Sequence, residues 1–127
     1  MSTHFYHTNA RDYFNQTIEV DPASFLMPFV KYLKPDSEIL DAGCGSGRDM
    51  LWLKERGFYC TGLERSPDLA ALARQHTGLP VIEADFASFD FSRMNMDAVL
   101  LIGALVHLPH DRFPLVLSNI LKALKPG

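Results

Sequence analysis

Three glycines that alternate with other residues constrain the fold of this chain more than any other feature. They lie in Gly43-Cys44-Gly45-Ser46-Gly47, after the apolar run 39–42 and before a helix-like stretch at 48–56 that Gly57 ends. Glycine permits positive φ and lets a ligand approach the backbone, and a helix start offers unpaired N–H groups. A strand, a glycine-rich turn and a helix in this order predict a βα unit with a ligand at the carboxyl end of the strand.

Strand-like and helix-like segments alternate along the rest of the chain. Ser66-Pro67-Asp68 is a strong helix start, with an N-cap hydroxyl, a first-turn proline and a first-turn acid. The alternation predicts an α/β fold, a doubly wound and mostly parallel sheet with right-handed crossovers. Strands are expected at residues 38–42, 59–63, 80–83 and 97–102, and helices at 8–16, 22–33, 48–56, 67–78 and 111–124.

Length and charge fit a single domain. The 127 residues suffice for one hydrophobic core, and shares of 47% hydrophobic and 21% charged residues are ordinary for a globular protein. We expect one domain over 1–127, with N-terminal helices in 1–35 and a ligand-binding core in 36–127. A net charge of −3 gives no basic field to concentrate a phosphate backbone, so no nucleic-acid partner is expected.

Cysteine usage favours a reducing compartment. Cys44 and Cys60 form no C-x-x-C pair, and two thiols make no disulfide framework. The first residues lack a basic region followed by an apolar run, and the apolar stretches are too short to cross a bilayer. We therefore expect a cytoplasmic protein with no membrane partner.

Two histidine pairs have a spacing that metal ligands could use, His4/His7 and His107/His110. Pro109 breaks the second pair's helix, and the first pair lies in a terminus where fraying is common. We expect no metal site.

The glycine spacing disfavours dinucleotides and nucleoside triphosphates. A G-x-G-x-x-G fingerprint needs its third glycine where the chain has Arg48 or Met50, and a P-loop needs Lys and then Ser or Thr where it has Arg48-Asp49. Asp41 puts a negative charge directly before the loop. A carboxylate there would repel a pyrophosphate but suits a ligand that carries an amine and a sulfonium.

The segment from Asp41 to Gly47 resembles the first motif of class I S-adenosylmethionine-dependent methyltransferases, an acid followed by alternating glycines. The chain is similar to their tellurite-resistance and ubiquinone-biosynthesis branches. The resemblance implies a Rossmann-like methyltransferase fold and transfer of a methyl group from S-adenosylmethionine to an unidentified small-molecule acceptor, with S-adenosylhomocysteine as product. It implies cofactor contacts for Asp41, Ala42, Gly43, Cys44, Gly45, Arg48 and Asp49.

Later positions also match the family. Glu64, at the end of the second expected strand with Arg65 beside it, stands about 20 residues after the first glycine, where an acid accepts the ribose hydroxyls. After the third strand come Ala84-Asp85-Phe86, where family members have an acid on the adenine amine and a residue that packs on its ring. Ile102 and Gly103 would border the methionine part of the cofactor.

Two more residues have roles implied by the resemblance. Tyr13 belongs to an aromatic N-terminal helix that would close over the cofactor. His107 is the one candidate for a catalytic contact, against a structural role that is more common at its position. Methyl transfer from a sulfonium depends mainly on alignment, and a base matters only if the acceptor must lose a proton.

The final residues, 121–127, resemble the point at which family members enter a fifth strand. The resemblance implies that the chain stops before the fold is complete, so we expect it to be inactive or weakened by itself, and much of the acceptor surface to lie beyond it. The apolar edge of the fourth strand would then favour a homodimer. Two alternatives stay open: a non-catalytic module that binds the cofactor, and a fragment of a nicotinamide-dependent oxidoreductase.

Overall fold

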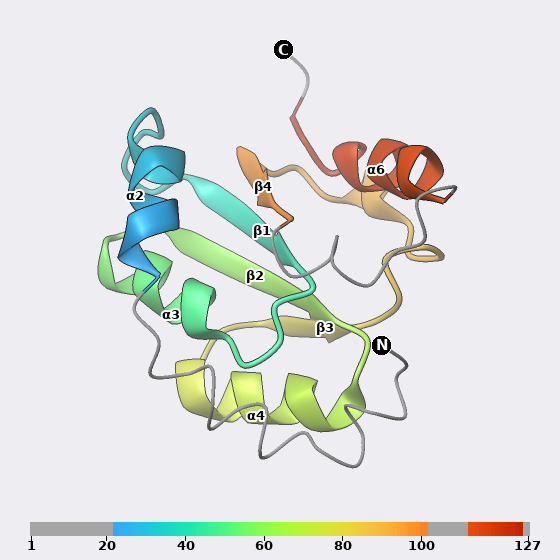
Figure 1. Ribbon diagram of the computed structural model, residues 1–127, viewed down its shortest axis with the longest axis horizontal. Coiled ribbons are helices and arrows are strands. Elements are labelled where there is room, and N and C mark those ends of the chain that lie inside the picture. The colour runs from blue at the N-terminus through green and yellow to red at the C-terminus, as the bar shows by residue number, and fades with distance from the viewer. Residues whose placement is uncertain (1–21, 102–111, 126–127) are drawn as a thin grey trace.

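The computed structural model describes residues 22–101 and 112–125, which form one parallel sheet between two layers of helices (Figure 1). The strands are β1 (Glu38–Ala42), β2 (Tyr59–Glu64), β3 (Val81–Glu83) and β4 (Ala98–Leu100), in the order β3-β2-β1-β4. The helices are α2 (Ala23–Val30), α3 (Arg48–Glu55), α4 (Pro67–Thr77), the 3₁₀ helix η1 (Phe91–Arg93) and α6 (Phe113–Leu121). The predicted α/β class and parallel sheet are confirmed.

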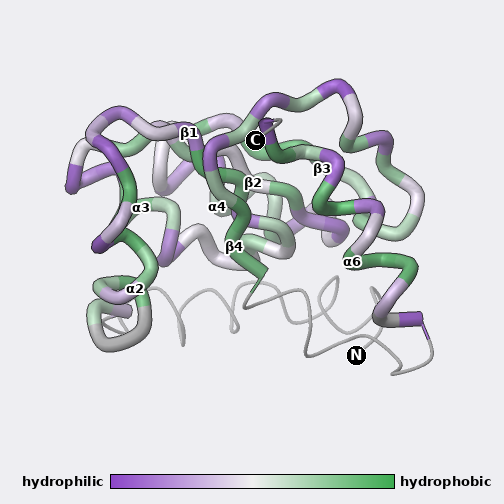
Figure 2. Tube along the Cα trace, turned by 90° about the horizontal axis from the view of Figure 1, so that it is seen from above, coloured by the Kyte–Doolittle hydropathy of each residue, from purple (hydrophilic) through white to green (hydrophobic). Residues whose placement is uncertain are grey.

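Alternate side chains of each strand enter two separate cores. Ile39 and Cys60 pack with residues of α3 and α4 on one face. Leu40 and Leu63 pack with residues of α6 on the other face. Figure 2 shows β4 as a hydrophobic stretch. Helices cover both faces because right-handed crossovers between parallel strands place them there.

Local sequence signals set several boundaries as predicted. The β1 strand has its expected bounds. The Ser66 hydroxyl accepts a hydrogen bond from the Leu69 N–H at the start of α4, and Gly78 ends that helix with φ 70°. Gly57, just after α3, has φ 91°. These ends follow from capping chemistry that the sequence displays directly.

Other boundaries differ from the expectation. The α2 helix ends at Val30 rather than at residue 33, where the Leu33 N–H bonds to the Val30 carbonyl in a tight turn. The α6 helix ends at Leu121 rather than at residue 124. Beyond it, the Ala123 carbonyl and the Lys125 N–H both bond to Met96 instead of continuing the helix. Backbone pairing with Met96, two residues before β4, therefore overrides helix propensity there.

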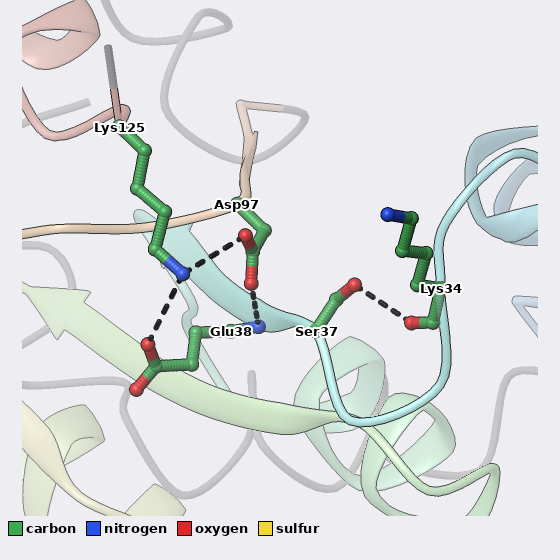
Figure 3. Close-up of polar contacts among 5 residues, drawn as sticks. All are labelled: Lys34, Ser37, Glu38, Asp97 and Lys125. Atoms are coloured by element: carbon green, nitrogen blue, oxygen red, sulfur yellow. Dashed lines mark hydrogen bonds and ion pairs between the residues drawn. The ribbon is translucent and has the colours of Figure 1, made fainter. Parts of the chain in front are cut away.

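A polar cluster joins the amino ends of β1 and β4 (Figure 3). The Asp97 carboxylate accepts from the Glu38 N–H at 2.8 Å and from Lys125 Nζ at 3.0 Å, and Lys125 also lies 3.8 Å from Glu38 Oε2. The Ser37 hydroxyl donates to the Lys34 carbonyl in the preceding turn. The Glu38 N–H and the Lys125 ammonium hold the pKa of Asp97 below its usual value.

No helix within the described ranges combines the length and the apolar character needed to span a membrane.

Gly47, the third glycine of the loop, allows α3 to pack closely on α4. Its φ is 85°, and a Cβ added there would lie 2.9 Å from Thr77 Cγ2 and 3.3 Å from Ala73 Cβ. Both the backbone conformation and the available space therefore require glycine. This third glycine therefore serves the packing of α3 on α4.

We predict that Gly47→Ala lowers the free energy of unfolding by about 2–4 kcal/mol, because left-handed strain and overpacking add together. Gly57→Ala is the matched control, since its φ is 91° but no atom lies within 4 Å of the added Cβ. It should lose only the strain, about 1–2 kcal/mol. Urea unfolding measures both losses, and equal losses would contradict the packing role.

A second substitution isolates the steric part. Thr77→Ser removes the Cγ2 methyl but keeps the hydroxyl that donates to the Ala73 carbonyl and accepts from the Leu79 N–H. In a double-mutant cycle, Thr77→Ser should recover part of the stability lost in Gly47→Ala. If the stability effects of the two substitutions simply add, the whole loss in Gly47→Ala comes from backbone strain.

Candidate functional site

Acidic residues gather where β1, β2 and β3 end. Glu64 is the last residue of β2 and pairs in register with Glu83 at the end of β3. Asp41 lies one residue before the end of β1 and pairs with Gly62. Ligands of open α/β sheets bind beyond the carboxyl ends of the strands, so this edge is the candidate site.

The Glu64 carboxylate connects the two loops that form the site. Its Oε1 accepts from the Gly45 N–H and its Oε2 from the Ser66 N–H, both at 2.9 Å. The side chain is 7% exposed, and burial raises its pKa while these hydrogen bonds oppose the rise. Each oxygen keeps a further lone pair, so the predicted acceptance of ribose hydroxyls stays a prediction compatible with this geometry.

Three N–H groups of the glycine loop point into the protein. Those of Gly43 and Cys44 both donate to the Leu63 carbonyl, at 2.7 and 3.0 Å, and that of Gly45 donates to Glu64. A loop that binds phosphate directs such groups at its ligand. This loop therefore differs from a phosphate cradle in its backbone as well as in its spacing.

Asp41 is the most deeply buried acid of the site. It is 2% exposed, and its Oδ2 has no hydrogen-bond partner among the described residues. Burial, reinforced by the negative charges of Asp49 and Glu64, raises its pKa well above the usual range, and Arg48 opposes the rise. A carboxylate in this position needs either a proton or a cationic partner.

The first turn of α3 adds a charged pair to the site. Arg48 Nε lies 2.9 Å from Asp49 Oδ1, and Asp49 is buried while Arg48 is half-buried. An acid in the first turn interacts favourably with the helix dipole. Arg65, half-buried after β2, lowers the pKa of Glu64 through its charge. The charges of Arg48 and Arg65 therefore partly oppose the rise in the pKa of Asp41 and of Glu64, respectively.

The segment after β3 lies next to Glu64. The Ala84 N–H donates to the Glu64 carbonyl at 3.1 Å. Asp85 is half-buried, and its Oδ1 accepts from the Ala87 N–H at 2.8 Å, which closes a turn. Phe86 is 8% exposed and belongs to the core on the α6 face, so a contact between its ring and a ligand stays a prediction.

Two other predicted contact residues also have core side chains. Ala42 is fully buried on the α6 face, and Cys44 is buried on the face covered by α3 and α4, where burial raises the pKa of its thiol. Their predicted contacts with a ligand are therefore expected to be through the backbone.

Some predicted residues cannot be placed. Tyr13, Ile102, Gly103 and His107 lie outside the described residues, as do both histidine pairs and the helix expected at 8–16. Within the described ranges, no cluster of three His, Cys, Asp or Glu side chains could hold a metal ion. Sequence reasoning treated Ser66 only as an N-cap and missed that its N–H donates to Glu64, a bond that nothing in the local sequence signals.

Residues 39–127 match a family model described as a methyltransferase domain. The chain is 29% identical over 124 residues to a 2-methyl-6-phytyl-1,4-hydroquinone methyltransferase from Synechocystis, covering 93% of this chain and 38% of that protein. It is 24% identical to a ubiquinone biosynthesis O-methyltransferase from Coxiella burnetii, covering 93% of this chain and 54% of that protein. The chain thus spans about half or less of the length of these curated relatives.

Solved structures share the fold. A TehB-like SAM-dependent methyltransferase from Corynebacterium glutamicum superposes with a TM-score of 0.73 at 24% identity, covering 96% of this chain and 66% of that one. At this level of identity the likeness concerns the arrangement of strands and helices. It confirms the Rossmann-like methyltransferase fold that the glycine motif predicts.

We predict that Asp41→Asn stabilises the unliganded protein relative to the natural sequence, and increasingly so as pH rises. The folded pKa of Asp41 lies above its unfolded value, so the folded state binds the proton more tightly. The stability that this provides is present below the unfolded pKa and is lost as pH rises through the folded pKa. Asparagine removes that loss because it stays neutral. Urea unfolding from about pH 5 to about pH 9 measures the difference.

Asp97→Asn is the control of opposite sign. The pKa of Asp97 is lowered in the folded state, so its contribution is present above the unfolded pKa and is lost as pH falls. This variant should lose stability at neutral pH and approach the natural protein in acid. Loss of stability at high pH in Asp41→Asn would contradict the description of Asp41 as a buried, unpaired acid.

Proposed function

The chain belongs to the methyltransferase domain family, and on this premise we propose that it binds S-adenosylmethionine and transfers its methyl group to a small-molecule acceptor. The observation that carries the proposal is the buried Asp41 carboxylate, whose Oδ2 has no hydrogen-bond partner in the described structure. An enclosed acid of this kind favours a cationic ligand. S-adenosylmethionine brings both an ammonium and a sulfonium group.

The backbone of the loop supports the same ligand class. The N–H groups of Gly43, Cys44 and Gly45 are bonded inside the protein and are not directed at a ligand. A pyrophosphate would therefore meet carboxylates without the donors that a phosphate loop supplies. This favours S-adenosylmethionine over NAD and over nucleoside triphosphates.

Each part of the cofactor has candidate partners in the site. We assign its charged methionine part to the surroundings of Asp41 and the Gly43–Gly45 backbone, with Arg48 and Asp49 at the start of α3. Glu64 would accept the ribose hydroxyls through its remaining lone pairs, beside Arg65. Asp85 would accept the exocyclic amine of adenine, with Ala84 and Phe86 next to it. Tyr13, Ile102 and Gly103 keep their predicted roles as a lid and a border of the methionine part.

The chemistry asks the protein mainly for alignment. When bound, S-adenosylmethionine supplies an activated methyl group on a positively charged sulfur. The contribution of this chain is to hold that donor in a fixed orientation, for which positioning can supply roughly 7–11 kcal/mol. His107 stays a proposal for a contact with the acceptor, which requires a base only if it must lose a proton in the reaction.

Small-molecule acceptors fit the names of several relatives. These include a hydroquinone methyltransferase, a sterol 24-C-methyltransferase and a structure of magnesium protoporphyrin IX methyltransferase with bound SAM. The net charge of −3 supports the same class over nucleic acid. We further propose that residues 1–127 form one cytoplasmic domain with the cofactor-binding core in 36–127, which fits the reduced state of Cys44 and Cys60.

Titration calorimetry with S-adenosylmethionine, S-adenosylhomocysteine and NAD tests the proposal. We expect the first two to bind and NAD not to bind. Binding of NAD alone would favour an oxidoreductase fragment, and binding of none of the three would overturn the proposal. Methyl transfer to hydroquinone and porphyrin acceptors then separates an enzyme from a non-catalytic module that merely binds the cofactor.

Charge-removing variants test the assigned residues within the same experiment. Asp41→Asn should weaken S-adenosylmethionine binding by about 1–3 kcal/mol because it removes the negative charge that would face the cationic ligand. Glu64→Gln should weaken binding by a similar amount, because its amide NH₂ group would leave one of the two buried N–H donors, of Gly45 or Ser66, without an acceptor. Glu83→Gln is the matched control, because Glu83 pairs in register with Glu64 but is exposed. Unchanged affinity in Asp41→Asn would remove Asp41 from the site.

We also propose that the outer edge of β4 pairs with a second copy of the chain. Within the described residues β4 pairs with β1, and the bridge between Met96 and Leu124 covers only the approach to its other edge. Uncovered backbone groups on an apolar strand favour such pairing. Light scattering over a range of concentrations should show a dimer, and a monomer at every concentration would refute it.

A further inference from the structure

Asn119 of α6 holds the segment that follows β3. Its Nδ2 donates to the Phe86 carbonyl at 3.2 Å and to the Phe89 carbonyl at 3.0 Å. Because both partners are carbonyl oxygens, the atom that faces them must be the amide nitrogen, and its two hydrogens serve the two bonds. In Figure 1 α6 lies beside this segment, although about 30 residues separate them in the chain.

Apolar packing fixes the same segment against α6. Phe86 and the fully buried Phe91 lie in one core with Val116 and Ile120 of α6. The Phe89 ring meets the Phe91 ring edge-on, with centroids 4.9 Å apart. Packing of this kind keeps the segment near α6, whereas the two directed bonds from Asn119 set its position along the helix.

The other side of this segment reaches the candidate site. The Ala84 N–H donates to the Glu64 carbonyl, and the Glu64 side chain in turn accepts from the glycine loop. Asp85 lies between these anchors, and its own turn is closed by bonds from the Ala87 and Phe89 N–H groups. The position at which α6 holds the carbonyls of residues 86 and 89 therefore determines the position of Asp85 relative to Glu64.

We propose that Asn119 is a positioning residue for the nucleobase: through the Phe86 and Phe89 carbonyls it places Asp85 to select a base that carries an exocyclic amine. The inference rests on the proposed function, since it takes the adenosine part of the cofactor to lie against this segment. A carboxylate that accepts from an amine discriminates against an oxo group at the same place, because two acceptors would then face each other.

The test compares two neutral ligands that differ at a single position of the base, 5′-methylthioadenosine and 5′-methylthioinosine. Calorimetry gives the ratio of their dissociation constants for the natural protein, Asn119→Leu and Asn119→Gln. We expect the natural protein to prefer the adenosine compound, and Asn119→Leu to reduce that preference by about five- to tenfold. Asn119→Gln keeps the amide donors and should retain part of the preference.

A merely structural role for Asn119 predicts a different result. Partial unfolding would lower the binding stoichiometry or weaken both ligands equally, which leaves their ratio unchanged. Ser118→Ala, at an exposed neighbouring position on α6, is the control for altering the helix and should leave the ratio unchanged. If Asn119→Leu does not fold, Asn119→Ser replaces it, since a hydroxyl can donate to only one of the two carbonyls.

The outcomes separate this inference from the proposed function. A natural protein that binds neither compound, nor S-adenosylhomocysteine, overturns the proposed function. A natural protein that binds both compounds equally overturns base selection by Asp85, and with it the role of Asn119. A clear preference that persists unchanged in Asn119→Leu, or in Asn119→Ser where that variant replaces it, overturns the positioning role and leaves the proposed function in place.

Discussion

The Glu64 carboxylate is the interaction on which the geometry of the site depends. It accepts one backbone N–H from the loop after β1 and one from the start of α4, and so fixes two separate βα turns to each other. A buried carboxylate without such donors would be costly, and so would the two buried donors without an acceptor. The conformation of the glycine loop and the buried charge of Glu64 therefore stabilise one another. The Leu63 and Glu64 carbonyls extend the same arrangement to Gly43, Cys44 and Ala84.

The site retains a group that does not favour folding. Glu64 compensates for its burial with hydrogen bonds, but Asp41 is buried beside two other acids with an unpartnered oxygen. Such groups persist at functional sites because the surrounding structure fixes them in place. A positively charged ligand would relieve both the missing hydrogen bond and the repulsion among the carboxylates. The charge of Asp41 thus lowers the stability of the unliganded protein but would raise its affinity for a cationic ligand.

Much of the fold could be predicted because its signals are local. The bounds of β1, the N-cap of α4 at Ser66 and the left-handed glycines at 57 and 78 follow from residues adjacent to each boundary. The residues at which α2 and α6 end could not be predicted in the same way. Helix propensity allowed α6 to continue to residue 124, but bonds between Met96 and the Ala123–Lys125 segment ended it earlier. The 3₁₀ helix at Phe91–Arg93 was not expected, since nothing in its three residues signals a helix and Phe91, its one aromatic residue, indicates only burial.

The sequence by itself determined the order of βα units, the parallel sheet and the acid followed by alternating glycines, because hydrophobic period and glycine spacing are properties of neighbouring residues. Tertiary structure decided what each of these residues does. Gly47 faces α4, the Phe86 and Cys44 side chains lie in opposite cores, and Asn119 reaches the segment after β3. The partners of Glu64 and Asn119 include residues 19 to 33 positions away, and only the packing of the sheet and its helices brings such groups together.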